Sequence, residues 1–144
     1  MAFLSSISIS GSALTAQKLR MQITAQNLAN ADSVSVDGTP YRRKVVTLSE
    51  RQKVDFNSTL TTALEKSNSL AGVEVKSITE DDSVVVEFDP DHPAADENGY
   101  VTKPAIDTTE EMVEMMAASR AYEANVTMFN AVKNMASKAL EIGR

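Results

Sequence analysis

The chain has 144 residues, 42% of them hydrophobic, which suits one domain or one elongated unit with a small appendage. It contains no cysteine, which excludes disulfide bonds and thiolate metal sites and is compatible with export into an oxidising space. The net charge of −6 argues against nucleic acid as a partner. No segment approaches the roughly 18 apolar residues of a transmembrane helix. The sequence shows no cleavable signal peptide, and we expect no direct lipid anchoring.

Residues 1–33 form the first predicted segment, a helix that starts between Phe3 and Ser12 and ends near Asn30. Residues 5–12 include five serines and a glycine, which are poorer helix formers than alanine, so order here should depend on packing. Apolar and small residues recur at three-and-four spacing, which is typical of one helix face: Leu4, Ile7, Gly11, Leu14, Met21, Ala25 and Leu28.

Charge is distributed unevenly along the chain. Residues 1–31 carry +2 and no acid, which leaves −8 for residues 32–144. The polar positions of the first helix hold mostly serine, threonine, asparagine and glutamine, and such groups can be buried when they find hydrogen-bond partners. We therefore expect other protein to surround this helix.

Residues 34–105 predict a β-rich insert with loops. Residues 41–47 have strand composition, and we expect Arg42 and Arg43 either to pair with acids of a neighbouring subunit or to face solvent. Residues 50–70 fit only a loop or a short helix.

The second half of the insert predicts further strands. Alternating apolar residues at 73–78 and a β-branched run at 84–88 are typical of two strands. The acidic residues 80–82 are expected to join these strands as a hairpin turn. Residues 100–102 predict a short last strand before the proline at position 104.

Residues 106–144 predict the longest helix, which begins at Thr108 and stops at Gly143. Thr108 and Glu111 have the spacing of a capping box, in which the glutamate reaches back to the cap amide. A helix of about 50 Å needs a second long helix beside it, and the amino-terminal helix is the candidate. The predicted fold is mainly α with a small β-rich insert, its terminal helices paired as an elongated coiled-coil-like hairpin. The expected contact stripe is Met112, Met115, Ser119, Tyr122, Val126, Phe129, Ala136 and Leu140.

The methionines of the last helix allow two interpretations. They form either an adaptable surface for several different neighbours or the core of the helix pair. Both interpretations give them a packing role and no chemistry. The residues concerned are Met112, Met115, Met116, Met128 and Met135.

The one cluster of ligand-type residues lies at 89–97, where several acids accompany His92. The helix-loop-helix calcium pattern requires another Asp or Asn and then a glycine where this chain has Pro93 and Ala94, so that pattern is not met. No nucleophile elbow or phosphate-binding loop occurs in the sequence. We expect no enzymatic activity and no cofactor. Two alternatives stay open, a small calcium- or ligand-binding module that uses residues 89–97 on a helix-pair scaffold, and a monomeric helical adaptor.

Four stretches carry a family resemblance. Residues 27–31, Asn-Leu-Ala-Asn-Ala, resemble a signature near the amino termini of bacterial flagellar rod and hook proteins. Residues 39–44, 88–101 and 111–125 are similar to motifs of the proximal rod proteins in that family. One departure is that relatives commonly carry Thr-Pro-Gly-Tyr shortly after the signature, whereas this chain has a longer loop before Tyr41.

The resemblance implies an axial structural subunit of the flagellar basal body. Such a subunit is exported by the flagellar type III apparatus without a cleaved signal and assembles into a helical tube across the periplasm, as part of the motor drive shaft. Its implied partners are its own kind, other proximal and distal rod subunits, and the basal-body export-gate adaptor. The terminal helices would pair in the inner tube, and the insert would lie further out.

We therefore predict an assembly interface that combines stripe positions of both helices with residues of the resembling motifs. Its members are Leu14, Met21, Asn27, Leu28, Asn30, Tyr41, Arg42, Arg43, Met112, Met115, Tyr122, Asn125 and Phe129.

Overall fold

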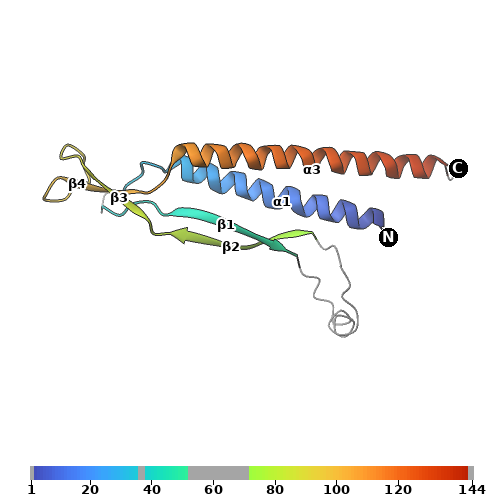
Figure 1. Ribbon diagram of the computed structural model, residues 1–144, viewed down its shortest axis with the longest axis horizontal. Helices are drawn as coiled ribbons and strands as arrows, with labels where there is room; N and C mark the ends of the chain where they lie inside the picture. The colour runs from blue at the N-terminus through green and yellow to red at the C-terminus, as the bar shows by residue number, and fades with distance from the viewer. Residues whose placement is uncertain (1, 36–37, 52–71, 143–144) are drawn as a thin grey trace, which may run out of the picture.

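The computed structural model describes residues 2–35, 38–51 and 72–142, which form an elongated molecule (Figure 1). The helices α1 and α3 lie side by side and antiparallel, so that the start of α1 and the end of α3 lie at the same end. Two antiparallel β-hairpins come from the segment between them. This arrangement confirms the predicted fold class of paired terminal helices with a small β-rich insert. The bounds are α1 Ala2–Ala29, β1 Arg43–Glu50, β2 Val73–Asp81, β3 Val84–Phe88, β4 Tyr100–Pro104 and α3 Thr108–Ile142.

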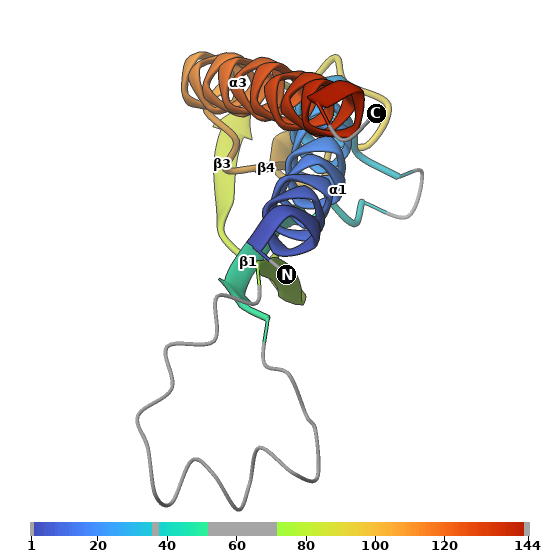
Figure 2. The ribbon, with the colours of Figure 1, turned by 90° about the vertical axis from the view of Figure 1, so that its right-hand side faces the viewer.

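α1 is the middle layer, with α3 on one side and the β1–β2 hairpin on another (Figure 2). Several buried side chains of α1 are polar, which agrees with the expectation that other protein covers the polar groups of this helix. Ala25 of the predicted stripe is nevertheless exposed, because a third side of α1 has no cover in the described chain. The buried residues of α1 are Ser10, Ala16, Ile23, Thr24 and Asn27. The half-buried members of the predicted stripe are Ile7, Gly11, Leu14, Met21 and Leu28.

At several positions, the residue of α3 that packs on α1 precedes the predicted stripe residue by one. Met112 is 46% exposed and Leu140 is 76% exposed, so the prediction is wrong for these two. Polar Glu111 and Asn125 and small Ala118 occupy the inner positions instead, and a search for apolar periodicity passes over such residues. The inner stripe alternates four-and-three spacing without interruption: Glu111, Met115, Ala118, Tyr122, Asn125, Phe129, Val132 and Ala136.

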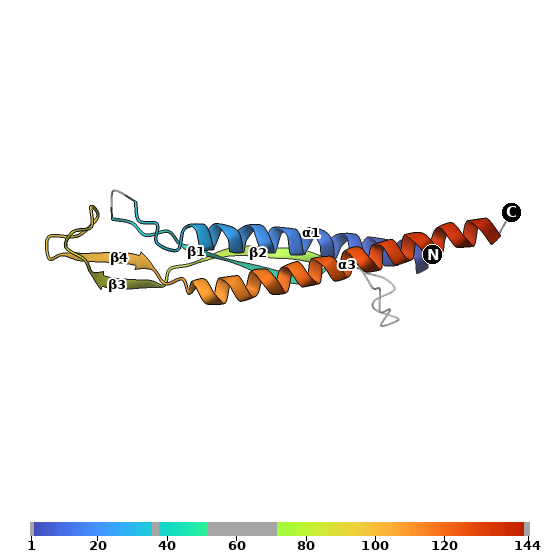
Figure 3. The same ribbon diagram turned by 90° about the horizontal axis from the view of Figure 1, so that it is seen from above.

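The strands pair differently from the prediction. β2 pairs antiparallel with β1, from Arg43 opposite Asp81 to Glu50 opposite Val73. β3 pairs antiparallel with β4 and forms a second hairpin that projects beyond the helices along the long axis (Figure 3). The predicted hairpin between residues 73–78 and 84–88 is therefore wrong, whereas the predicted last strand is confirmed as β4.

The connection after β2 explains why β2 and β3 do not pair. The Asp81 carboxylate accepts hydrogen bonds from the Ser83 amide at 3.0 Å and the Ser83 hydroxyl at 2.6 Å. After this local turn the chain continues along the long axis beyond the ends of the helices and does not fold back onto β2 (Figure 1). The prediction for residues 50–70 lies almost entirely outside the described residues.

Gly72 holds the start of β2 against α1. Its backbone has φ +94°, and a Cβ atom there would lie 2.4 Å from the Ser12 hydroxyl oxygen. That oxygen is already engaged, because it accepts from the Val73 amide at 3.1 Å and donates to the Ile9 carbonyl at 2.8 Å. We expect Gly72→Ala to lower the free energy of unfolding by about 1–3 kcal/mol, measured by urea denaturation.

Gly11 supplies the matched control for this prediction. It lies within α1, and a Cβ atom at this position would meet no atom within 4 Å. Gly11→Ala should therefore stabilise the isolated chain by about 0.5–1 kcal/mol through helix propensity. Equal effects of the two substitutions would contradict the role assigned to Gly72.

Asp107 caps α3, in place of the predicted Thr108–Glu111 capping box. Its carboxylate accepts from the amides of Thr109 at 2.7 Å and Glu110 at 3.3 Å. A carboxylate is a better acceptor for these amides than a hydroxyl, because it also carries charge complementary to the helix dipole. Glu111 does not reach back to the cap, because its side chain is buried between the helices and the insert.

The cap gives a prediction about pH. The amides of Thr109 and Glu110 hold the pKa of Asp107 below its usual 3.8. A carboxyl with a lowered folded-state pKa contributes stability above its unfolded-state pKa, and this contribution is lost as the pH falls through the folded-state value. Asp107→Asn keeps an acceptor oxygen that does not titrate.

Between about pH 5 and about pH 2, the first turn of α3 should therefore lose less order in Asp107→Asn than in the wild-type chain. The NMR signals of the Thr109 and Glu110 amides report this difference directly. The same pH dependence in both chains would contradict the assignment of the cap.

Candidate functional site

Asn27, in the last turn of α1, is 2% exposed and links this helix to the insert. Its amide nitrogen donates to the Lys44 carbonyl at 2.8 Å and to a Glu111 carboxylate oxygen at 3.2 Å. Its amide oxygen accepts from the Lys44 backbone N–H at 2.9 Å and from the Tyr41 hydroxyl at 3.1 Å. The side chain thus pairs with the backbone of β1 much as a neighbouring strand would, and uses both donors and both lone pairs of the amide.

Glu111, in the first turns of α3, is 1% exposed and provides the third connection. One carboxylate oxygen accepts from Arg43 Nε at 2.7 Å and lies 2.7 Å from Arg43 Nη2. The Arg43 side chain is only 21% exposed, so this charge pair is largely shielded from water. Buried charges are tolerated when they are paired and hydrogen-bonded, as both are here.

The titration behaviour of two side chains reflects this shielding. Partial burial lowers the pKa of the Arg43 guanidinium, but its hydrogen bond to Glu111 and the Glu111 charge outweigh burial and leave the pKa raised. Burial, and then the negative charges of Glu80 and Glu111, raise the pKa of Tyr41 above its usual 10.0. The Tyr41 hydroxyl therefore stays protonated and remains a donor to Asn27.

We call this cluster the polar joint and define it as Asn27, Tyr41, Arg43, Lys44 and Glu111. It connects α1, the segment before β1, β1 itself and α3 at one point near the end where the helices meet the insert (Figure 1). The side chains of Asn27, Tyr41, Arg43 and Glu111 and the backbone of Lys44 are joined by hydrogen bonds, so the cluster holds these elements together. A fully satisfied buried network of this kind rigidifies the elements that it joins.

Three residues of the predicted interface, Asn27, Tyr41 and Arg43, meet in the polar joint. Arg43 was expected to pair with a neighbouring subunit or to face solvent, and both expectations are wrong, because its partner is Glu111 of the same chain. Arg42 does face solvent, where it pairs with Asp82 at 2.6 Å. The predicted interface omitted Glu111, although its four-and-three spacing with Met115 and Ala118 marks it as a member of the inner stripe.

The other predicted interface residues lie outside the joint. Asn30 donates to the Gln26 carbonyl at 2.8 Å within its own turn, and Met112 is exposed. Asn125 likewise donates to the Ala121 carbonyl at 2.8 Å. Half-buried members on the two helices are Leu14, Met21 and Leu28, and Met115, Tyr122, Asn125 and Phe129.

α3 carries a second stripe, rotated by roughly a third of a turn from the inner stripe, and this stripe is exposed. Val113 is 57% exposed, Met128 57% and Met135 55%. Of the five methionines, only Met115 is half-buried in the inner stripe, so the core interpretation is wrong for the other four. We call this second set the outer stripe and define it as Val113, Ala117, Ala124, Met128, Ala131 and Met135.

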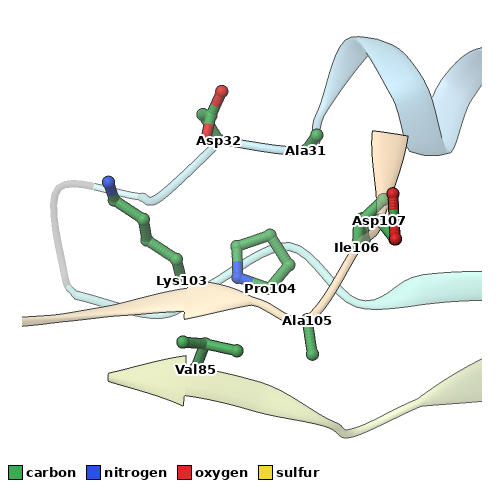
Figure 4. Close-up of a pocket in the computed structure, with 8 residues that line it drawn as sticks. All are labelled: Ala31, Asp32, Val85, Lys103, Pro104, Ala105, Ile106 and Asp107. Atoms are coloured by element: carbon green, nitrogen blue, oxygen red, sulfur yellow. The ribbon is translucent and has the colours of Figure 1, made fainter. Parts of the chain in front are cut away.

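An open groove of about 420 Å³ lies where the β3–β4 hairpin meets the rest of the molecule (Figure 4). Ala31 and Asp32, which follow α1, lie on one side of it, and Val85 lies on the other. The remaining lining residues are Lys103, Pro104, Ala105, Ile106 and Asp107.

The described residues show neither a metal site nor a membrane-spanning helix. No group of three or more His, Asp or Glu side chains is placed to hold a metal ion in this part of the chain. In the loop at residues 89–97, the Asp96 carboxylate instead accepts hydrogen bonds from the backbone amides of Asn98 at 2.9 Å and Tyr100 at 2.8 Å. The calcium alternative thus lacks its ligand set here. Neither described helix is long and apolar enough to cross a membrane.

Comparisons with known proteins show similarity to flagellar rod proteins at both ends of the chain and over its full length. A family model described as flagella basal body rod protein matches residues 7–35, and one described as the carboxy-terminal region of flagellar basal body rod FlgEFG proteins matches residues 97–142. The flagellar basal-body rod protein FlgC of Bacillus subtilis (strain 168) is 46% identical over 146 residues, with 96% of this chain and 97% of that protein covered. The chain belongs to the FlgC family of flagellar basal-body rod proteins.

FlgC proteins of other bacteria show the same full-length similarity. That of Salmonella typhimurium is 42% identical over 146 residues and covers 100% of both chains. That of Borreliella burgdorferi is 39% identical over 149 residues, with coverage of 99% and 98%. The resemblance to flagellar rod proteins is confirmed. The two matched regions contain Asn27 and Glu111, the two most deeply buried members of the polar joint.

Proposed function

We propose that this FlgC-family chain builds the rod by packing the outer stripe of its α3 against neighbouring subunits. Family membership makes the chain a structural subunit of the flagellar basal-body rod. The observation that carries the proposal is that α3 has two stripes, the mixed inner stripe covered by α1 and the apolar outer stripe that stays exposed. An exposed apolar stripe on a long helix is typical of a surface that is buried on assembly.

The polar joint has a mechanical role in this proposal. A rod that serves as a drive shaft must resist bending between its helical core and its outer part. The joint connects these parts through buried hydrogen bonds and one shielded charge pair, which leaves the insert little freedom to swing on the helix pair. We place the core in residues 1–33 and 106–144 and the outer part in residues 34–105.

Partners and delivery follow from the same proposal. We infer that neighbours are copies of this chain and other proximal and distal rod subunits, with the export-gate adaptor at the base. We further infer export through the flagellar type III apparatus and a purely structural role. The absence of cysteine and the occupied polar groups of the joint support these inferences.

Ala124 tests the proposal, because it lies in the middle of the outer stripe and is exposed in the single chain. We expect Ala124→Asp to leave the isolated chain folded but to remove it from purified basal bodies and abolish swimming. The reason is that assembly would bury a carboxylate without a partner, at a cost of several kcal/mol. Immunoblots of isolated basal bodies measure incorporation, and circular dichroism measures helix content.

Asn130→Asp is the matched control, since Asn130 is also exposed but lies on another side of α3. This variant should enter basal bodies at the wild-type level. Incorporation of Ala124→Asp at the wild-type level would overturn the proposal that the outer stripe is the assembly surface.

A further inference from the structure

The β3–β4 hairpin exposes one apolar face that nothing in the described chain covers. The register places Val86 opposite Thr102 and Phe88 opposite Tyr100, and the two aromatic rings lie 5.3 Å apart in an edge arrangement. Exposed fractions are 48% for Val84, 59% for Val86, 64% for Phe88 and 48% for Tyr100. We call these four residues the hairpin face. A two-stranded hairpin is at best marginally stable alone, so a face of this kind indicates a partner.

The hairpin and the far end of α3 differ in charge. Residues 84–104 contain five acids and one lysine, a net charge of −4. Residues 124–142 have a net charge of +1, which comes from Lys133, because Lys138 pairs with Glu141 at 2.8 Å. These segments lie at opposite ends of the molecule, with the hairpin projecting beyond the helices (Figures 1 and 3). Complementary charge at opposite ends favours head-to-tail contact between copies.

The far half of the outer stripe offers a surface of suitable shape. Met128 and Met135 are more than half exposed, and the small residues Ala124 and Ala131 lie between and beside them. Small side chains allow a strand pair to approach the helix closely, and methionine adapts to the shape of a facing aromatic ring. We call these four residues the far stripe.

The hairpin cannot reach the far stripe of its own chain. Met135 lies 27 residues beyond Thr108 on one continuous helix, which corresponds to about 40 Å. The hairpin joins α3 at its start and points away from the rest of that helix (Figure 3). An occupant of the far stripe must therefore come from another molecule.

We infer that the hairpin face of one copy packs on the far stripe of a second copy of this chain, displaced along the long axis. This inference rests on the proposed function and adds a specific contact to it. Each copy then donates one hairpin and accepts another, which is a heterologous contact that extends without closing and suits a rod. The acidic hairpin would lie beside the basic far end of α3, which also favours one direction of stacking over the reverse.

Cysteine pairs test this contact, because the chain has no cysteine of its own. We would place Val86→Cys and Met135→Cys in one chain, isolate basal bodies, and treat them with a short bis-maleimide. The expected result is a ladder of covalent dimers and higher species, with mass spectrometry joining the Val86→Cys peptide of one copy to the Met135→Cys peptide of another. The control chain combines Val86→Cys with Asn130→Cys on the other side of α3 and should give no ladder.

Two readouts keep the inference separate from the proposed function. Incorporation into basal bodies without the ladder would overturn the hairpin contact while the rod function stands. If the cysteine variants fail to enter basal bodies, a photoreactive residue in place of Val84 in an otherwise unchanged chain tests the hairpin contact. Capture of residues 124–142 from a second copy supports the inference, and capture of another rod protein or of a different region overturns it.

Discussion

Glu111→Ala is expected to lower the free energy of unfolding by about 3–5 kcal/mol, because it leaves the shielded Arg43 guanidinium without its partner. The Arg43 side chain is 21% exposed and donates to Glu111 at 2.7 Å, so water replaces little of the lost interaction. Asn27 also loses one acceptor at 3.2 Å. Urea denaturation of the purified chain measures the change, and faster hydrogen exchange at the Lys44 amide would localise it to the polar joint.

Glu114→Ala is the control for this substitution. Glu114 lies one turn further along α3 and faces Arg20 at 3.8 Å, with both side chains 38% exposed. Exposed pairs of this kind contribute about 0–1 kcal/mol, so the control should be nearly neutral. The double variant Arg43→Met and Glu111→Leu should recover part of the loss, because it removes both charges from the buried site. If Glu111→Ala were as mild as Glu114→Ala, the joint would not hold the elements together.

Asn27→Asp is expected to destabilise the chain by about 3 kcal/mol or more, although the two side chains have the same shape. The change removes both amide donors and places a carboxylate oxygen against the Lys44 carbonyl and the Glu111 carboxylate. Repulsion in a buried site then replaces two hydrogen bonds. Thermal unfolding followed by circular dichroism measures the loss relative to wild type.

The same variant should acquire a distinctive pH dependence. Burial and the Glu111 charge would raise the folded-state pKa of the introduced carboxyl above its unfolded value of about 3.9. The difference in melting temperature between variant and wild type should therefore be smallest below that value and grow as the pH rises through the folded-state pKa. Asn30→Asp is the control, since Asn30 bonds only its own helix turn. A pH-independent difference for Asn27→Asp would contradict the proposed geometry.

The polar joint and the outer stripe have separate roles. Substitutions in the polar joint are expected to weaken the single chain, whereas substitutions in the outer stripe are expected to leave the single chain intact and prevent assembly. A comparison of Glu111→Ala with Ala124→Asp therefore separates folding from rod building. Incorporation into basal bodies and unfolding of the purified chain are the two measurements to compare.

The sequence by itself determined the paired helices and the family of this protein. Helix length and three-and-four spacing are local properties, and they led to the correct elements α1 and α3 without any contact information. Strand composition likewise located all four strands to within a few residues. The motif at residues 27–31 indicated the family, but it did not show what Asn27 contacts.

Only the tertiary structure decided how these elements are joined. Asn27 and Glu111 are 84 residues apart, and Arg43 and Glu111 are 68 residues apart, so no local pattern links them. Polar residues at inner helix positions look like solvent-facing residues until their partners are known, which is why Glu111 was taken for a cap. The strand pairing was predicted wrongly for the same reason. β2 pairs with β1, which is distant in the sequence, and not with the adjacent β3, and β1 and β2 both pack on α1. Periodicity thus specified the elements, whereas partner choice depended on buried polar groups that are satisfied only when distant segments meet.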